Sequence, residues 1–169
     1  NLAAALARRG RRTLLMDLDP QSHCAVGLAV PEEAIDLQSG DALLHAGRAI
    51  DLSRLVWTVA RNLDLIPSTT KLAGVEAARG GLADRDDREA RLAVFLASVD
   101  SRYDYALIDC PPSIGLLTFN ALRAAGEVLI PVETAFFALQ GAAKQIATLR
   151  AVCRRFGTQA GFRVVATMH

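Results

Sequence analysis

Two carboxylates follow a short apolar run near the start of the chain, in the sequence RTLLMDLDPQ at residues 12–21. Asp17 and Asp19 are spaced i, i+2, so on an extended strand both side chains would point to the same side. Burying an unpaired carboxylate is unfavourable, so packing alone does not explain them. Two acids that face one crevice repel each other unless a proton or a metal ion relieves the repulsion. This spacing therefore predicts a site for a cation or a proton where the run ends.

A second apolar run, ALIDCPPS at residues 106–113, ends in one acid, Asp109, and is followed by a Pro-Pro loop. This is the Walker-B pattern, in which an Asp holds Mg²⁺ through its water shell while the metal bridges the β- and γ-phosphates of a nucleotide. Many strands also end in an Asp that only caps the next element. Asp17 and Asp19 have a similar alternative: they could be a structural pair that caps a helix or binds an arginine.

The elements that would position these acids alternate between strands and helices. Apolar runs predict strands at 12–18, 62–68, 103–113, 125–133 and 162–168. Amphipathic patterns predict helices at 86–102 and 138–156, a helix that opens the chain, a weaker one from residue 71, and short ones around 22–29, 39–46 and 51–56. Such alternation favours an α/β fold, a parallel sheet with helices on both faces. Because chemistry gathers at the carboxyl ends of such strands, we expect Asp17, Asp19 and Asp109 at one edge of the sheet.

Composition sets the broad class of the protein. The 169 residues, 51% hydrophobic and only 5% aromatic, suit an α/β domain with small side chains between helices and sheet. A net charge of +1 excludes neither nucleic acid nor acidic partners.

Cys24, Cys110 and Cys153 are far apart and form no CxxC pair, which favours a reducing cytoplasm and gives no iron–sulfur pattern. Cys110 is expected to be a small buried residue at the strand end. No apolar run reaches the length of a membrane span, so nothing here predicts a membrane partner.

Three segments taken together resemble the ParA family of partitioning ATPases, in the family's order and spacing: NLAAALARRGRRTLLMDLDPQ, YDYALIDCPPSIGLLTFNAL and VLIPVETAFFALQG. These are deviant-Walker P-loop ATPases related to the division-site protein MinD. The resemblance implies a P-loop NTPase-like α/β fold of the SIMIBI class, with a twisted parallel sheet. The chain departs from the family at Glu133 and Ala135, where the family more often has Gln and Glu.

The resemblance also implies roles for the residues of the first acidic segment, with ATP and Mg²⁺ as cofactors. Asp17 would interact with the water shell of Mg²⁺. Asp19 would orient or activate the water that attacks the γ-phosphate. Pro20 and Gln21 would form the first switch loop together with Asp19.

In the second segment the resemblance implies that Asp109 is the Walker-B acid, acting on Mg²⁺ through water. Pro111, Pro112 and Ser113 would form the second switch loop. Loops that contact the γ-phosphate and relax on hydrolysis convert the nucleotide state into a change of partner affinity.

The family's phosphate loop, a Gly-rich turn with a signature Lys, has no counterpart in residues 1–169, and no GxxxxGK[ST] motif occurs in them. The chain begins as if within a helix and stops as a strand finishes. We therefore expect residues 1–169 to be a single partial ParA-like ATPase domain, incomplete at both ends. Since the loop's amides and lysines carry most of the phosphate affinity, this segment alone is expected to bind ATP poorly or not at all.

Four cations of the helix at 138–156 lie opposite its apolar stripe: Lys144, Arg150, Arg154 and Arg155. An ordinary solvated face accounts for them, and cations also suit a helix C-terminus. The family resemblance implies instead that they form part of a surface that binds DNA without sequence preference.

As a whole, the resemblance implies an ATPase that dimerises with itself when ATP is bound, binds DNA non-specifically and is stimulated by a ParB-like partner. Its role would be segregation of a chromosome or plasmid, in the cytoplasm and on the nucleoid. One alternative is a degenerate binding module that keeps the sheet but has no catalytic function. Another is an ATPase that positions division sites or flagella; MinD-type proteins additionally need a C-terminal amphipathic membrane helix.

Overall fold

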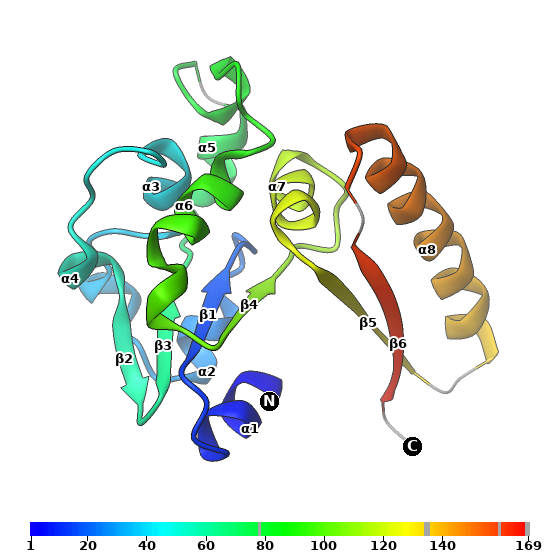
Figure 1. Ribbon diagram of the computed structural model, residues 1–169, viewed down its shortest axis with the longest axis horizontal. Coiled ribbons are helices and arrows are strands. Elements are labelled where there is room, and N and C mark those ends of the chain that lie inside the picture. The colour runs from blue at the N-terminus through cyan, green and yellow to red at the C-terminus, as the bar shows by residue number, and fades with distance from the viewer. Residues whose placement is uncertain (78, 134–135, 159, 168–169) are drawn as a thin grey trace. The chain divides into compact units, whose positions relative to one another are not determined.

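The structure is a computed structural model that describes residues 1–77, 79–133, 136–158 and 160–167. The chain forms two compact units, Asn1–Ala121 and Leu122–His169, and each is described by itself (Figure 1). None of the described helices combines the length and the hydropathy needed to cross a membrane.

The first unit is built on a four-stranded sheet of order β2-β3-β1-β4. Its strands are β1 (Thr13–Asp17), β2 (Trp57–Ala60), β3 (Leu63–Ile66) and β4 (Tyr105–Asp109). Strand β1 pairs in parallel with both β3 and β4, and β2 pairs antiparallel with β3 at one edge. In the β1–β4 register Asp17 lies opposite Asp109, so the two strands end at the same level.

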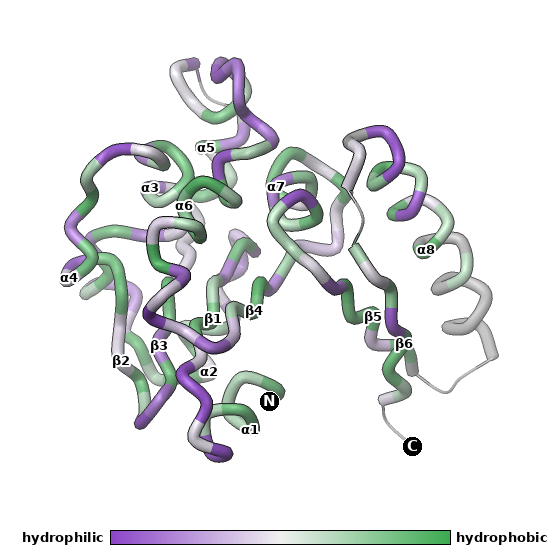
Figure 2. The backbone as a smooth tube through the Cα atoms, in the orientation of Figure 1, coloured by the Kyte–Doolittle hydropathy of each residue, from purple (hydrophilic) through white to green (hydrophobic). Residues whose placement is uncertain are grey.

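Strand β1 is the core of this sheet because its apolar side chains point to both faces. On one face Leu14 and Met16 are fully buried. On the other, Leu15 packs with Ala3 and Ala7 of helix α1 (Leu2–Arg8). These alanines place little bulk between helix and sheet, so α1 can approach the strands closely. Figure 2 shows the hydrophobic colouring along β1 and β4.

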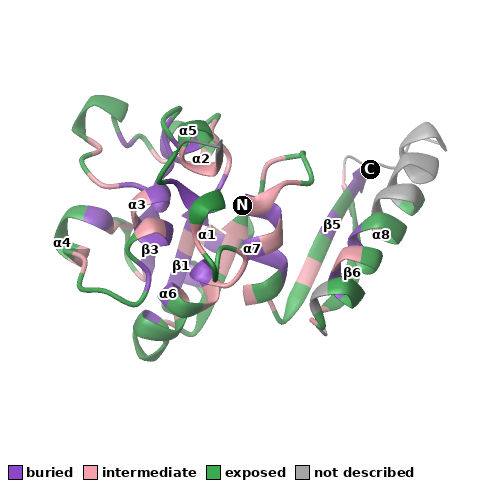
Figure 3. Cartoon of the chain, turned by 90° about the horizontal axis from the view of Figure 1, so that it is seen from above, coloured by how far each residue is buried: buried purple, intermediate pink, exposed green. Residues whose placement is uncertain are grey.

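The remaining helices of this unit are short and connect the strands. They are α2 (His23–Gly27), α3 (Ser39–Leu44), α4 (Leu52–Leu55), α5 (Leu72–Ala77), α6 (Arg91–Val99) and α7 (Leu116–Ala124), the last of which runs into the second unit. Single 3-10 turns occur at Glu32–Ala34, Leu82–Asp84 and Asp100–Arg102. Helix α2 packs through Ala25 against Leu65 of β3. Figure 3 shows α2 and α6 on opposite sides of the sheet.

The second unit contains two parallel strands, β5 (Glu127–Glu133) and β6 (Gly161–Thr167), joined by the long helix α8 (Phe136–Phe156). Its core combines Ile130 and Val132 of β5 with Leu149 and Cys153 of α8. Leu149 and Cys153 belong to the apolar stripe that the sequence predicts for this helix.

The α/β class is confirmed, and all five predicted strands are present, but they pair within two sheets, one in each unit. The sheet of the first unit is not wholly parallel, because Trp57–Ala60 forms an antiparallel strand that the sequence analysis did not predict. This strand is only four residues long and turns back directly into β3, so it gives a weak periodic signal. Helix α7 was not predicted either.

The helix predicted at 86–102 is shorter than expected. It begins at Arg91, and residues 86–90 form turns before it, so no acid lies in its first turn. Asp87 instead accepts a hydrogen bond from the Arg91 guanidinium at 3.0 Å. Asp87 therefore binds a side chain rather than the helix N-terminus.

Candidate functional site

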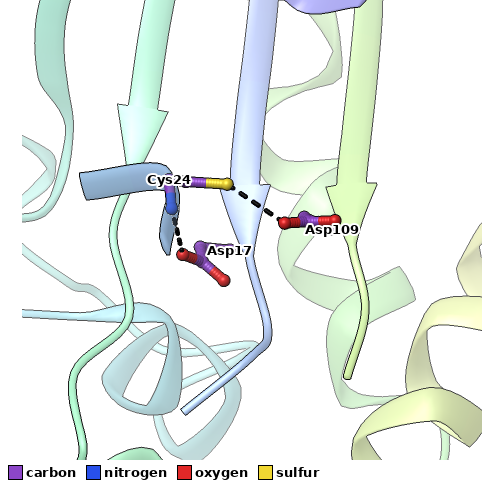
Figure 4. A group of neighbouring side chains, drawn as sticks. All are labelled: Asp17, Cys24 and Asp109. Atoms are coloured by element: carbon purple, nitrogen blue, oxygen red, sulfur yellow. Dashed lines mark hydrogen bonds between the residues drawn. The ribbon is translucent and has the colours of Figure 1, made fainter. Parts of the chain in front are cut away.

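Asp17 and Asp109 meet at the carboxyl ends of β1 and β4, as the strand order predicts. The backbone N–H of Leu18 donates to the carbonyl of Asp109 at 2.8 Å, which extends the pairing one residue past Asp17. A carboxylate oxygen of Asp17, the Sγ of Cys24 and a carboxylate oxygen of Asp109 all lie within 4.8 Å of one another. Figure 4 shows these three side chains converging from β1, α2 and β4.

The Asp17 side chain is held in place by backbone donors and has no access to solvent. Its Oδ1 accepts the N–H of Asp19 at 2.9 Å, and its Oδ2 accepts the N–H of Cys24 at 3.2 Å. Burial raises the pKa of Asp17, these two hydrogen bonds oppose the rise, and the charge of Asp109 adds to it. Among the residues described, no ion pair reaches this carboxylate. As far as the structure describes the chain, the site is thus negative and lacks a protein cation.

Cys24 is the third member of the group. Its thiol donates to Oδ2 of Asp109 at 3.2 Å. Burial raises the pKa of the Cys24 thiol above its ordinary value, and the negative charges of Asp17 and Asp109 raise it further. The thiol therefore stays protonated at neutral pH and can act as a donor to Asp109.

Asp19 lies past the end of β1, in the turn that follows it, so strand alternation does not orient its side chain. Its Oδ1 accepts the N–H of Gln21 at 3.0 Å, which closes a turn that includes Pro20. Asp19 is half-buried and does not belong to the group formed by Asp17, Cys24 and Asp109. The i, i+2 spacing therefore does not orient Asp19 relative to Asp17, because only Asp17 lies on the strand.

Two serines that the sequence analysis did not single out fix this turn. The Ser68 hydroxyl donates to the carbonyl of Asp19 at 2.5 Å, and the Ser22 hydroxyl donates to the carbonyl of Ser68 at 2.6 Å. Both serines are buried, and Ser22 adopts a left-handed backbone with φ of 57°. The loop after β3 thereby holds the loop after β1. The only signal in the sequence is that the predicted strand 62–68 ends in a Ser.

The loop after β4 contains Pro111, Pro112 and Ser113. Pro112 and Ser113 are exposed, and the Ser113 carbonyl accepts the Thr118 hydroxyl at 2.7 Å. Cys110 is exposed, so the expectation of a buried residue there is wrong. The reason is that β4 pairs on one side only among the described strands, which leaves its end open.

Two departures from the family pattern lie outside what the structure describes: the side chain of Glu133 and the whole of Ala135.

The predicted basic face lies on α8, in the second unit. Arg150, Arg154 and Arg155 are exposed, while the side chain of Lys144 lies outside the described residues. The Arg150 guanidinium carbon lies 5.6 Å from the centre of the Phe162 ring, within range of a cation–π contact. Arg154 and Arg155 are also exposed, and among the described residues neither makes a ring contact like that of Arg150.

The residues of the first unit fit a hard divalent cation. Mg²⁺ prefers oxygen ligands and is usually held by one or two carboxylates together with water molecules. A buried carboxylate beside a second, exposed one supplies that donor set, and no protein cation competes for it among the described residues. Residues 1–169 contain no Gly-rich phosphate loop, so the donor set described here is one for a metal ion and not a phosphate cradle.

A family model described as an AAA domain matches residues 1–161. The sporulation initiation inhibitor protein Soj of Bacillus subtilis is 41% identical over 158 residues, which cover 94% of this chain and 60% of Soj. The chromosome partitioning protein ParA of Myxococcus xanthus is 45% identical over 141 residues, covering 83% of this chain and 48% of that protein. The chain thus spans about half the length of the curated relatives it matches.

Solved structures of a related enzyme share the fold. The crystal structure of cobyrinic acid a,c-diamide synthase from Mycobacterium smegmatis matches with a TM-score of 0.87 and 32% identity, over 99% of this chain and 66% of that one. The same enzyme with a bound ATP analogue and magnesium matches with a TM-score of 0.82 and 33% identity, over 98% of this chain and 65% of that one.

Proposed function

Because this chain belongs to the ParA family of partitioning ATPases, we propose that the full-length protein hydrolyses ATP to ADP and phosphate in chromosome or plasmid segregation. The observation that carries the proposal is the pairing of Asp17 with Asp109 at the ends of two parallel strands. A buried carboxylate without a protein cation is costly for a fold to keep, and a nucleotide-bound metal would offset that cost.

In this proposal Asp17 and Asp109 hold the water shell of Mg²⁺. The metal supplies charge neutralisation for the phosphates when it is bound. The N–H groups of Asp19 and Cys24 keep the Asp17 carboxylate oriented toward Asp109. The Cys24 thiol restrains Asp109 through its hydrogen bond.

Asp19 is the residue proposed to orient or activate the attacking water. Its carbonyl accepts the Ser68 hydroxyl and its Oδ1 accepts the N–H of Gln21. Since no residue that the structure describes donates to its second carboxylate oxygen, that oxygen is available for a water molecule. A general base that is held in position in this way typically contributes on the order of 10²-fold or more to a rate.

The loops after β1 and β4 are the proposed switches, formed by Asp19, Pro20 and Gln21 and by residues 111–113. With ATP bound they would favour a homodimer that binds DNA non-specifically, and a ParB-like partner would stimulate hydrolysis. The proposed setting is the cytoplasm, on the nucleoid. Positioning of division sites or flagella is the alternative cellular role.

A non-catalytic binding module is the second candidate function. The observation in its favour is that residues 1–169 contain no GxxxxGK[ST] motif. Such a module would keep the sheet and bind its protein or DNA partners, but it would not hydrolyse nucleotide.

Phosphate release by the full-length protein separates these candidates. We expect turnover that requires Mg²⁺ and that falls strongly in Asp109→Asn, because that change removes one of the paired charges. The matched control is Asp36→Asn, an exposed acid paired with Arg54 away from the strand ends. A full-length protein that neither binds nor hydrolyses ATP would support the binding module instead. Sedimentation with ATP, with ADP and without nucleotide then tests the proposed dimer.

A further inference from the structure

Cys24 gives the acidic site a ligand that Mg²⁺ does not favour. We propose that Asp17, Cys24 and Asp109 bind a thiophilic divalent cation such as Zn²⁺ by direct coordination, with a fourth position left to water. Thiolate sulfur is a soft ligand that selects zinc-like ions, whereas Mg²⁺ prefers oxygen and keeps its waters. A ligand set of one sulfur and two carboxylate oxygens therefore favours a different class of metal from the Mg²⁺ of the proposed nucleotide site.

The geometry is close to what such a cation requires. A tetrahedral Zn²⁺ with Zn–S of about 2.3 Å and Zn–O of about 2.0 Å sets its ligand atoms roughly 3.5 Å apart. Here the Cys24 Sγ lies 3.2 Å from Oδ2 of Asp109, and the three ligand atoms lie within 4.8 Å of one another. Small side-chain rotations bring all three within reach of one ion.

The ligand atoms also keep free lone pairs for a metal. Among the hydrogen bonds of the described residues, each oxygen of Asp17 accepts one from the backbone, which leaves each oxygen a second lone pair. Those two N–H groups fix the orientation of the carboxylate, as hydrogen bonds to the ligands do in metal sites. When the Zn–S bond forms, the Cys24 S–H proton leaves to solvent, and Asp109 exchanges a thiol donor for the metal. No electron is transferred.

The three ligands come from different elements, β1, α2 and β4, and two of them are rigidly placed. Asp17 is fully buried on the central strand, and Asp109 lies opposite it in a parallel register. The site is therefore built by the fold rather than by a flexible loop. It also has no competing protein cation among the described residues, whose ion pairs involve other acids.

The consequence for turnover rests on the proposed function. A zinc-like ion held directly by Asp17 and Asp109 occupies the carboxylates that are proposed to hold the water shell of Mg²⁺. Zinc should then inhibit hydrolysis by the wild type and leave a protein without the thiol less affected. The binding itself needs neither ATP nor turnover.

The test titrates Co²⁺ into nucleotide-free full-length protein and follows the thiolate-to-cobalt charge-transfer absorption, with Zn²⁺ added afterwards to displace it. Cys110 provides the matched control, because it is an exposed thiol one residue after Asp109. We expect the band in the wild type and in Cys110→Ser, and its loss in Cys24→Ser, where a hydroxyl keeps a donor toward Asp109. Asp109→Asn, at an exposed position, should weaken Co²⁺ binding by more than about tenfold.

Three results would overturn the proposal: no charge-transfer band in the wild type, loss of the band in Cys110→Ser rather than in Cys24→Ser, or unchanged affinity in Asp109→Asn. Circular dichroism of each variant shows that the fold is retained. Phosphate release with added Zn²⁺ is measured separately. A protein that binds Co²⁺ through Cys24 but does not hydrolyse ATP would contradict the proposed function and leave the metal site standing.

Discussion

At the scale of single residues, the site depends on a carboxylate that the fold buries and then surrounds with donors. Asp17 has no solvent access, and its oxygens accept the backbone N–H groups of Asp19 and Cys24 while the charge of Asp109 lies nearby. Because burial raises the pKa of Asp17, this residue weakens the folded state at neutral pH in the absence of a cation. If Asp17 only capped a helix, it would not need a second acid beside it. Asp109 nevertheless lies next to it and accepts the Cys24 thiol.

Ser68 is the residue that most directly ties the Asp19 turn to the rest of the first unit. Ser68→Ala removes the hydroxyl that joins the loop after β3 to the Asp19 carbonyl, which then keeps only the N–H of Ser22 as a donor. We expect a loss of about 1–2 kcal/mol in the free energy of unfolding, measured by urea denaturation. Turnover should fall more than nucleotide affinity, because the Asp19 turn loosens.

The matched control is Ser53→Ala, an exposed hydroxyl bonded to Asp51, which should change stability by less than about 0.5 kcal/mol. Equal effects of the two serine variants would show that Ser68 does not position the turn.

Residue types and spacing predicted Asp17 and Asp109 as a pair, because both end apolar runs and parallel strands end at one edge. They could not predict Cys24 or Ser68. Cys24 reaches Asp109 across 85 positions of sequence, and Ser68 reaches Asp19 across 49. Contacts of this kind depend on how loops fold back over a sheet edge, and no local pattern encodes them.

At the scale of elements, one buried arginine joins helix α6 to helix α3. Arg91 donates from Nε to the carbonyl of Leu43 at 2.8 Å and from Nη2 to the carbonyl of Leu44 at 2.9 Å. These are carbonyls at the C-terminal end of α3 that have few helical partners. Arg91 is only 8% exposed, so its charge is held almost entirely by protein groups.

Replacing this side chain should therefore weaken the fold clearly. Arg91→Met should lower the free energy of unfolding by about 2–4 kcal/mol, because the charge-assisted hydrogen bonds to the carbonyls are lost together. The comparison is Arg88→Met, whose side chain is 51% exposed and should cost less than about 1 kcal/mol. Urea denaturation of both variants measures the difference, and similar losses would contradict the proposed link.

An exposed ion pair joins β1 and β4 at their N-terminal ends, away from Asp17 and Asp109. The Asp104 carboxylate accepts the Arg12 guanidinium at 2.8 Å and the Arg12 backbone N–H at 2.8 Å. The guanidinium first, and then the backbone N–H, hold the pKa of Asp104 below its ordinary value. A lowered folded pKa stabilises the protein above the unfolded pKa, and that stability is lost as the pH falls through the folded pKa.

Asp104→Asn should therefore lower the melting temperature at neutral pH, and the difference from the wild type should shrink toward zero in acid. Thermal melts across this pH range measure the effect. Glu32→Gln, at an exposed position on a 3-10 turn, serves as the control and should show no such trend. A difference between Asp104→Asn and the wild type that stays constant with pH would exclude the ion pair as its cause.

The alternation of strands and helices predicted most of the elements, since long apolar and amphipathic runs are strong local signals. It did not predict β2, because four residues at a sheet edge alternate between half-buried and exposed side chains without a hydrophobic run. It also set the start of α6 too early. The acids at 86–89 suit a helix N-terminus, but Asp87 accepts the Arg91 side chain instead.

At the scale of the whole molecule, the exposed arginines of α8 are the part of the proposed DNA surface that can be tested in this chain. Arg154→Ala together with Arg155→Ala should weaken binding to all DNA sequences alike. The slope of log affinity against log salt should fall by about 0.9 for each lost phosphate contact. The melting temperature should barely change, because exposed charges contribute little to stability.

The control is the pair Arg8→Ala and Arg9→Ala, two adjacent exposed arginines at the end of α1 and directly after it, which give the same change in net charge. If both pairs reduce DNA affinity equally, net charge rather than the α8 face is responsible. If the Arg154 and Arg155 variant matches the wild type, the face is only solvated.

The central claim is that the acids at and just past the end of β1 serve nucleotide chemistry rather than structure, and Asp19→Ala tests it most directly. ATP affinity and phosphate release are measured side by side in the full-length protein. We expect affinity close to that of the wild type and turnover reduced on the order of 10²-fold or more, because the base that positions the attacking water is gone. Turnover that matches the wild type at unchanged affinity would contradict the account.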